Sequence, residues 1–176
     1  MDSLTSDEIR KILVCVDNKR DGLLIQMGLT MGCRVSEICS IETKNIKPNG
    51  IKIWDEKKDC YREVVLDSDT SSLLQDYLEH DWKPKQHQHH KLFYFSPKTA
   101  NRIFKRWCEK AGIEKKKAHW HTLRHTYIIH SLDADVPLNY ICSQTGDTPN
   151  TVINVYGMPS WDKRVEMINQ KGRYWK

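Results

Sequence analysis

His121-Thr122-Leu123-Arg124-His125-Thr126 is the stretch of this 176-residue sequence that says most about its fold. His121 and Arg124 are three residues apart, so a helix would place both on one face, where they can address a single phosphate. The pair combines a group that exchanges protons near neutral pH with a fixed cation. Helical surfaces often carry this spacing, so its meaning depends on the segments around it.

A second arginine stands far upstream, in Gly32-Cys33-Arg34-Val35-Ser36-Glu37. The apolar residues that follow predict a short helix opening near Arg34, with Glu37 one turn later. An arginine held by a carboxylate presents a rigid guanidinium to phosphate oxygens. A purely structural ion pair explains this segment equally well, and taken alone it is the better interpretation.

Residues 45–66 change from helical periodicity to alternation, as strands do. Pro48-Asn49-Gly50 supplies a tight turn, and the polar run from Asp55 to Cys60 predicts the tip of a second hairpin. We therefore expect a small antiparallel sheet of about three strands. Lys57 and Lys58 lie at the tip, where a lysine can donate a proton to a leaving oxygen; a solvated hairpin tip is the simpler interpretation of either one.

The rest of the chain has helical patterns. Thr5 and Glu8 form a capping box, helices are expected from Ser68 and from about Thr99 to Ala111, and two or three more cover residues 121–167. The predicted fold class is α+β, mainly α with a small antiparallel sheet. Near its end, the chain has Gly146-Asp147 and, nine residues after Asp147, Tyr156. A tyrosine, with a pKa of ~10, is a weak nucleophile unless neighbouring cations stabilise its phenolate.

Composition narrows the function classes. Hydrophobic residues make up 39% and charged residues 29%, as in a soluble globular protein, and no apolar run is long enough to span a membrane. The N-terminus has no secretory signal, so a cytoplasmic protein is expected. The six cysteines include no Cys-x-x-Cys pair, and His80, His87, His89 and His90 lie in a polar loop without ligand spacing. No metal and no cofactor are predicted.

Residues 98–117 hold eight lysines or arginines and two glutamates. Such a local excess suits a polyanion, and DNA is the expected partner. A solvated helix face and loop remains the simpler interpretation of this segment alone.

In their order, these segments resemble the tyrosine recombinase family, also called the lambda-integrase family, over nearly the whole chain. The matching landmarks are Gly32 to Glu37, the hairpin Lys57 before Arg62-Glu63-Val64-Val65-Leu66, Leu92-Phe93, Ala111-Gly112-Ile113, His121 to Thr126, and Tyr156. The resemblance implies that DNA strands are cut and rejoined through a 3′-phosphotyrosyl bond, without ATP or metal.

The resemblance also assigns roles by position. Tyr156 would attack the phosphate, Arg34 and Arg124 would bind its non-bridging oxygens, and His121 would exchange a proton with Tyr156. Lys57 would protonate the departing 5′-oxygen, and Lys58 competes for that role. Glu37 and His125 would support the site.

Two departures from the family pattern stand out. Asp147 occupies a position where the family usually has His or Trp, and an ionised Asp cannot donate a hydrogen bond to phosphate. Asp147 therefore points away toward Arg or Lys, is protonated, or slows the enzyme; we favour the first. The N-terminal core-binding domain of the family is also expected to be absent, so residues 1–176 would be a catalytic domain with weak, salt-dependent DNA affinity.

Several alternatives stay open. One is a DNA-binding module of the same fold that has lost catalysis, and another is DNA relaxation like that of a type IB topoisomerase. The expected partner is double-stranded DNA, with a homotetramer in the synaptic complex and weak or no self-association otherwise. An element such as a virus or plasmid is the expected source, which places the protein in the cytoplasm, with the nucleoid, or in a host cell's cytoplasm. Residues 161–168 predict a final helix that packs on its own domain or on a neighbour.

Overall fold

The computed structural model describes residues 2–56, 58–84, 90–157 and 161–171. They form two units, Met1–Gly146 and Asp147–Lys176. In the first unit, α1 (Ser6–Cys15) opens with the predicted capping box: Thr5 Oγ1 accepts from the Glu8 backbone N–H, and the Glu8 carboxylate accepts from that of Thr5.

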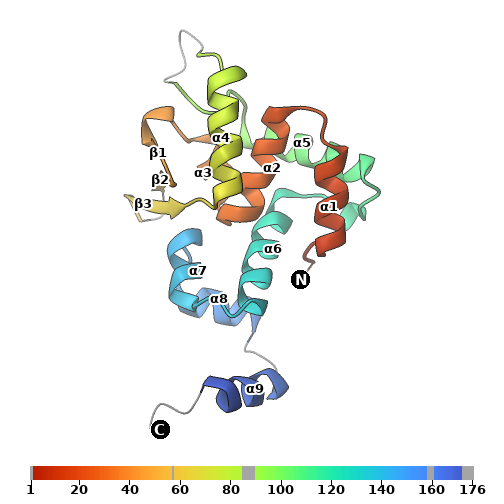
Figure 1. The fold of residues 1–176 in the computed structure, drawn as a ribbon, viewed down its shortest axis with the longest axis vertical. Coiled ribbons are helices and arrows are strands. Elements are labelled where there is room, and N and C mark those ends of the chain that lie inside the picture. Colours follow the sequence, from red (N-terminus) through yellow and green to blue (C-terminus); the bar gives the residue numbers. More distant parts are fainter. Residues whose placement is uncertain (1, 57, 85–89, 158–160, 172–176) are drawn as a thin grey trace. The chain divides into compact units, whose positions relative to one another are not determined.

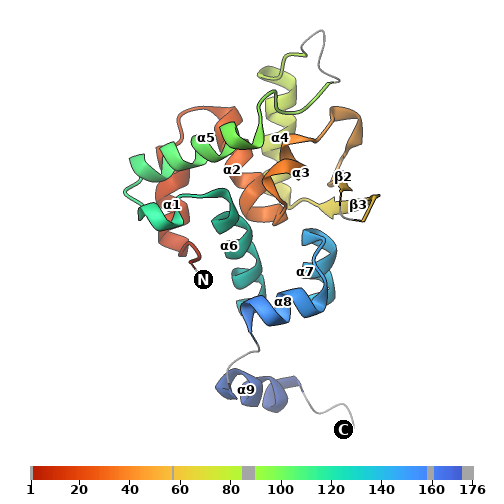
Figure 2. The ribbon, with the colours of Figure 1, turned by 180° about the vertical axis from the view of Figure 1, so that it is seen from behind.

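Helix α2 (Lys19–Met31) is the centre of the first unit and contacts α4, α5 and α6. It begins before the apolar run that marks it in the sequence, because the side chain of Asn18 accepts a hydrogen bond from the Asp21 backbone at 2.9 Å and caps the helix. It ends at Gly32, whose φ of 61° is left-handed. Figure 2 shows α5 crossing the back of α1, α2 and α3.

The predicted three-stranded sheet is confirmed. Its order is β1 (Ile46–Lys47), β2 (Gly50–Asp55) and β3 (Cys60–Val65), antiparallel throughout, and the short 3-10 helix η1 (Thr43–Asn45) precedes it. The register pairs Ile51 with Val64 and Ile53 with Arg62. Ile51, Ile53 and Val64 are buried, so one face of the sheet belongs to the core.

Six further helical elements complete the described part of the first unit. They are α3 (Val35–Cys39), which precedes the sheet, and then, in the order shown in Figure 1, α4 (Ser68–His80), α5 (Pro97–Lys110), η2 (Lys115–Lys117), α6 (Trp120–Asp133) and α7 (Leu138–Thr145). Helix α5 begins at Pro97 rather than at Thr99, because Ser96 caps it and proline suits a first helical position. The largest fully buried side chains are Trp107, Phe93 and Phe104.

The second unit contains α8 (Pro149–Tyr156) and α9 (Trp161–Lys171). In the described residues, four helices follow His119, more than the two or three predicted. The reason is that Pro137 and Gly146 interrupt the helical run, with Gly146 at φ 76° as the cap of α7. The predicted class, mainly α with a small antiparallel sheet, is confirmed.

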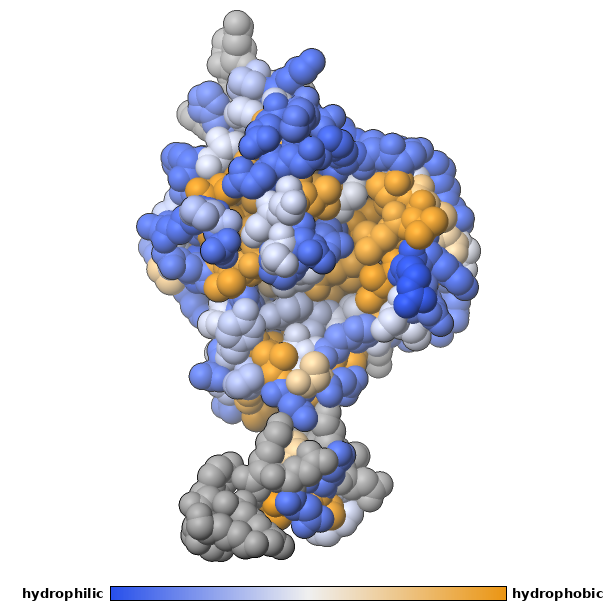
Figure 3. All heavy atoms as spheres, in the orientation of Figure 1, coloured by the Kyte–Doolittle hydropathy of each residue, from blue (hydrophilic) through white to orange (hydrophobic). Residues whose placement is uncertain are grey.

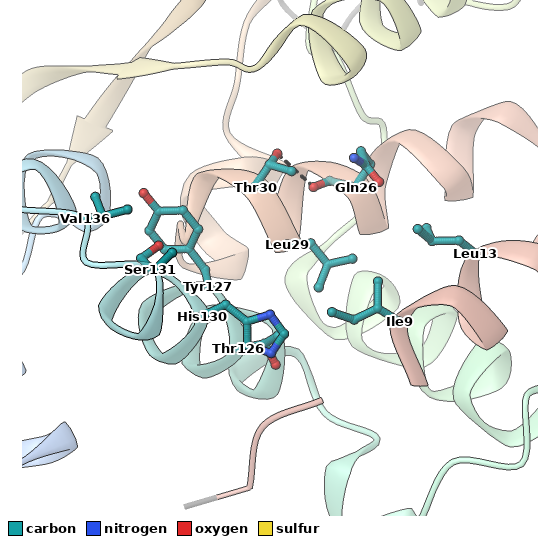
Figure 4. A pocket seen from close by; sticks show the side chains of 11 residues that line it. Ile9, Leu13, Gln26, Leu29, Thr30, Thr126, Tyr127, His130, Ser131 and Val136 are labelled. Carbon is teal, nitrogen blue, oxygen red and sulfur yellow. Dashed lines mark hydrogen bonds between the residues drawn. The ribbon is translucent and has the colours of Figure 1, made fainter. Parts of the chain in front are cut away.

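Apolar side chains are visible on the surface between α1 and α4 (Figure 3). A hollow of about 350 Å³ between α1, α2 and α6 is lined mostly by apolar side chains, among them Ile9, Leu29 and Tyr127 (Figure 4). None of the predicted site residues lines it. Among the helices of the described ranges, none is long and apolar enough to cross a bilayer.

Candidate active site

Glu37 holds the arginine that precedes α3. Its Oε2 accepts a hydrogen bond from the Arg34 backbone N–H at 2.8 Å, and its Oε1 accepts one from Arg34 Nη1 at 3.1 Å. The Glu37 side chain is 5% exposed and that of Arg34 is 29% exposed. The ion pair expected from the sequence is present, and it leaves part of the Arg34 guanidinium at the surface.

Arg62 of β3 is a second partner of the same carboxylate. Its Nη1 and Nη2 donate to Glu37 Oε1 and Oε2 at 3.0 and 2.8 Å, and its Nε donates to the Gln144 carbonyl at 3.2 Å. Asp55 Oδ2 lies 3.7 Å from Arg62 Nη1. Burial is the largest single effect and disfavours the charged guanidinium, but the hydrogen bonds to Glu37 and the nearby charges of Glu37 and Asp55 together outweigh it and raise the pKa of Arg62. Arg62 thus stays charged and joins the hairpin to α3 and α7.

The sequence analysis used Arg62 only as a landmark and gave it no part in the site. A signal was available, since Arg62, Val64 and Leu66 alternate along the strand and therefore share one face. An arginine on the core face of a strand needs an anionic partner. That requirement predicts a carboxylate near Arg62, and the structure places Glu37 and Asp55 there.

Arg124 is fixed by backbone carbonyls. It lies on α6, is 3% exposed, and donates through Nη1 to the carbonyls of Gly32 at 2.7 Å and Thr145 at 3.0 Å. Gly32 lies two residues before Arg34, so one hydrogen bond connects the segments of the two arginines. Segments that are far apart in sequence are brought together here, as the ordered landmarks predicted.

Gly146 and Gln144, at the C-terminal end of α7, complete the network around Glu37 and Arg62. A Cβ at Gly146 would lie 2.9 Å from Asp55 Oδ2 and 3.1 Å from Arg62 Cζ, and the φ of 76° is left-handed, so any other residue would strain the backbone and displace these side chains. The Gln144 side chain exchanges two hydrogen bonds with the backbone of Val65, at 2.9 and 3.2 Å. Helix α7 is thereby attached to the edge of β3. The sequence analysis gave neither residue a role.

His121 and His125 are neighbours on α6. Their ring centroids are 4.3 Å apart and the rings meet edge to face. His121 is exposed, whereas His125 is buried. Burial, together with the nearby His121, His119 and Arg124, lowers the pKa of His125 to about 4. His125 is therefore neutral at pH 7 and packs edge to face against the exposed His121.

The lysines of the hairpin are only partly described. Lys57 lies outside the described residues. Lys58 is exposed in the turn between β2 and β3, and its backbone N–H donates to the Asp55 carbonyl at 3.1 Å. The hairpin tip expected between Asp55 and Cys60 is confirmed, and the choice between the two lysines stays a prediction.

Asp147 and Tyr156 belong to the second unit. Asp147 is its first residue, Thr148 caps α8, and Tyr156 is the last residue of that helix. The placement of Tyr156 beside the two arginines stays a prediction, and so does the orientation of Asp147.

The basic segment 98–117 divides into two groups. Arg106 donates to Asp21 at 2.6 Å, and Lys117 pairs with Glu8 at 2.9 Å. Lys98 and Arg102 are exposed on the first half of α5. All basic residues of this segment except Lys117 are exposed, but the carboxylates of Asp21 and Glu8 offset the charges of Arg106 and Lys117.

Within the described part of the chain, no three His, Cys, Asp or Glu side chains gather as a metal site requires. The histidine-rich loop largely lies outside the described residues. The buried Cys33 beside Arg62 has its pKa raised to about 12 by burial, so it remains a neutral thiol.

Comparison with known proteins places this site in a family. Residues 2–158 match the family described as "Phage integrase family". A tyrosine recombinase of Pseudothermotoga lettingae is 31% identical over 173 residues, which cover 96% of this chain and 60% of the relative. The chain thus belongs to the phage integrase family, and its relatives are tyrosine recombinases.

Solved structures agree on the fold. The XerA recombinase matches with a TM-score of 0.81 at 22% identity, covering 97% of this chain and 65% of that one. The Tn1549 transposon integrase, solved in complex with a circular intermediate DNA, matches with a TM-score of 0.77 at 17% identity, covering 96% and 65%. This chain therefore spans less than two thirds of the length of these relatives.

Proposed function

We propose that this chain is the catalytic region of a site-specific DNA recombinase that cuts and rejoins strands through Tyr156. The observation that carries the proposal is the network around Gly32, Glu37 and Arg62, which holds Arg34 and Arg124 in neighbouring segments. Two fixed guanidinium groups stabilise the charge that develops on a phosphate under attack. Family membership and the DNA complex of the transposon integrase support DNA as the substrate.

In the proposed reaction, the phenolic oxygen of Tyr156 attacks phosphorus, and the bond from phosphorus to the 5′-oxygen breaks. Tyr156 gives its proton to His121, and the departing 5′-oxygen receives a proton from Lys57, with Lys58 as the alternative donor. The products are a 3′-phosphotyrosyl bond and a free 5′-hydroxyl. Attack by a 5′-hydroxyl of another strand reverses the step, so the phosphodiester energy is kept and neither ATP nor a metal is required.

Among the proposed site residues, Asp147 has the charge least compatible with a bound phosphate. Beside a phosphate, its carboxylate would be repelled. We propose that it turns toward a basic side chain instead, which leaves the phosphate to the two arginines. Replacing Asp147 with histidine, which can donate a hydrogen bond, should then change the cleavage rate little or raise it.

The proposal extends to the setting of the reaction. Residues 1–176 would form a catalytic domain that acts on double-stranded DNA in a homotetrameric synaptic complex and associates weakly or not at all without DNA. A mobile element such as a virus, plasmid or transposon would encode it, and it would act in the cytoplasm at the DNA.

Covalent capture tests the proposal. Nicked suicide duplexes with a randomised sequence around the nick should yield a protein–DNA adduct whose sequence can be recovered. The adduct should disappear in Tyr156→Phe and remain in the matched control Tyr94→Phe. Absence of any adduct while the duplexes are bound would favour a DNA-binding module instead, and an adduct retained by Tyr156→Phe would contradict the assignment of the nucleophile.

A further inference from the structure

Two aromatic side chains stand on the solvent-facing side of the β2–β3 hairpin. Trp54 and Tyr61 are partners in the strand register, and their ring centroids are 5.0 Å apart at an interplanar angle of 67°. They remain 37% and 54% exposed. A cross-strand aromatic pair can serve only to stabilise a sheet. Evidence that this pair also binds a ligand must therefore come from the residues around it.

Both rings line one recess of about 410 Å³ beside α3. Ile41 and Ile53, which are almost fully buried, supply apolar lining. A smaller hollow of about 80 Å³ is lined by Arg34 and shares four residues with this recess, namely Glu37, Ser40, Trp54 and Glu56. Trp54 therefore borders both the recess and the hollow at the arginine that is proposed to bind phosphate.

The rim of the recess is held by long-range backbone hydrogen bonds. The Leu92 N–H donates to the Ile41 carbonyl at 2.8 Å, and the Thr43 N–H donates to the His90 carbonyl at 2.9 Å. These bonds fix the segment that runs from α3 to η1 independently of its side chains. The recess is therefore a formed feature of the fold.

The charges of the recess do not suit a phosphate. Its lining contains the carboxylates of Glu37, Glu42 and Glu56 and the ammonium groups of Lys52 and Lys91. Glu37 is already paired with two arginines. The lining as a whole therefore has no excess of positive charge, and it favours a neutral group over an anion.

A flat group with a polar edge fits this lining better. Aromatic side chains stack on any nucleobase, whatever its sequence. Asn45, which is partly exposed, lines the same recess. An amide offers both a donor and an acceptor, as the edge of a base requires.

We infer that this recess receives one unpaired nucleobase from the DNA next to the phosphate held by Arg34, with Trp54 and Tyr61 as the stacking surface and Asn45 at the base edge. The inference rests on the proposed function, since it presumes DNA at Arg34. It adds a base-binding site outside the group of residues that carry out the cleavage.

A sequence-independent probe tests it. The probe is a duplex with a single unpaired 2-aminopurine, compared with the same duplex fully paired; anisotropy of an end label gives the affinity, and 2-aminopurine emission reports stacking. The protein should bind the bulged duplex about five-fold or more tightly than the paired one. Trp54→Ala should lose most of this preference without weakening the binding of the paired duplex, and Trp54→Phe should keep part of it.

Glu63→Ala is the matched control, because it removes the exposed cross-strand Lys47–Glu63 pair of the same sheet without touching the recess. It should keep the full preference. If Trp54→Ala does not fold, Tyr61→Ala replaces it and should likewise lose most of the preference for the bulged duplex. Equal binding of both duplexes, or a preference that survives both alanine variants, overturns the inference alone. Binding to neither duplex contradicts the proposed function and the inference with it.

Discussion

Arg62 donates to both carboxylate oxygens of Glu37, at 3.0 and 2.8 Å, whereas the Arg34 side chain reaches only one of them, at 3.1 Å. The carboxylate that orients Arg34 is therefore held from the hairpin as well as by the Arg34 backbone N–H, which donates to Oε2 at 2.8 Å. The position of Arg34 therefore depends on β3, the strand that follows the hairpin tip. Substitutions that distort β3 should therefore shift the Glu37 carboxylate and, with it, Arg34.

Arg62→Ala should destabilise the protein by about 3–5 kcal/mol, because it leaves the buried Glu37 carboxylate short of a partner. Urea unfolding followed by circular dichroism measures this loss. Lys47→Ala is the matched control, since it breaks an exposed ion pair of the same sheet, and it should change the midpoint little. Equal losses in the two variants would show that the Glu37 network does not hold the hairpin.

Gly146→Ala should abolish adduct formation and lower stability by at least about 1–2 kcal/mol from the left-handed backbone alone. The added Cβ also meets Asp55 and Arg62. Gly112→Ala is the matched control: its φ of 69° is also left-handed, but nothing lies within 4 Å of the new Cβ. It should show only the backbone cost and keep activity. The argument fails if both variants form the adduct equally well.

The stability of the protein should fall as pH decreases from about 6.5 to about 4 because of His125. Its pKa is lowered to about 4 in the folded chain, so the unfolded chain binds more protons in this window and is favoured as pH falls. The loss from this group is up to about 3 kcal/mol. Thermal unfolding of the protein and of His125→Gln across this range measures it, and the variant should lose less.

His80→Gln serves as the control for this pH dependence, because the His80 side chain is 62% exposed. It should follow the wild-type curve. A His125→Gln curve parallel to that of the wild type would mean that buried His125 does not set the acid sensitivity.

Lys98→Ala and Arg102→Ala should each weaken DNA binding and reduce the slope of log affinity against log salt by about 1, if each exposed side chain contacts one phosphate as proposed. Arg106→Ala should instead lower stability by about 1–3 kcal/mol, because Arg106 pairs with the buried Asp21. Anisotropy titrations at several salt concentrations separate the two effects. A salt slope that drops equally in all three variants would contradict this division of α5.

Much of the fold follows from local sequence signals. The capping box at Thr5 and the alternation of residues 45–66 each predict structure that is present. The helices after His121 were undercounted, because Pro137 and Gly146 divide one apolar pattern into short pieces that periodicity does not resolve.

The site was predictable where its residues lie in short motifs. Arg34 with Glu37, and Arg124 on α6, lie where the sequence placed them. Arg62 and Gln144 were not found, because their contacts join residues 25 and 79 positions apart or more. Such contacts depend on how β3 and α7 pack, which local patterns do not encode. The recess beside Trp54 also depends on packing between distant segments, so local patterns do not predict it.

The anchoring of Arg124 has a consequence for how the chain tolerates sequence change. Its Nη1 donates to the carbonyls of Gly32 and Thr145, which are backbone atoms. Any residue at position 145 supplies that carbonyl, provided that α7 keeps its course. Sequence change at position 145 can therefore leave this acceptor in place, and the main-chain path of α7 is what selection must preserve.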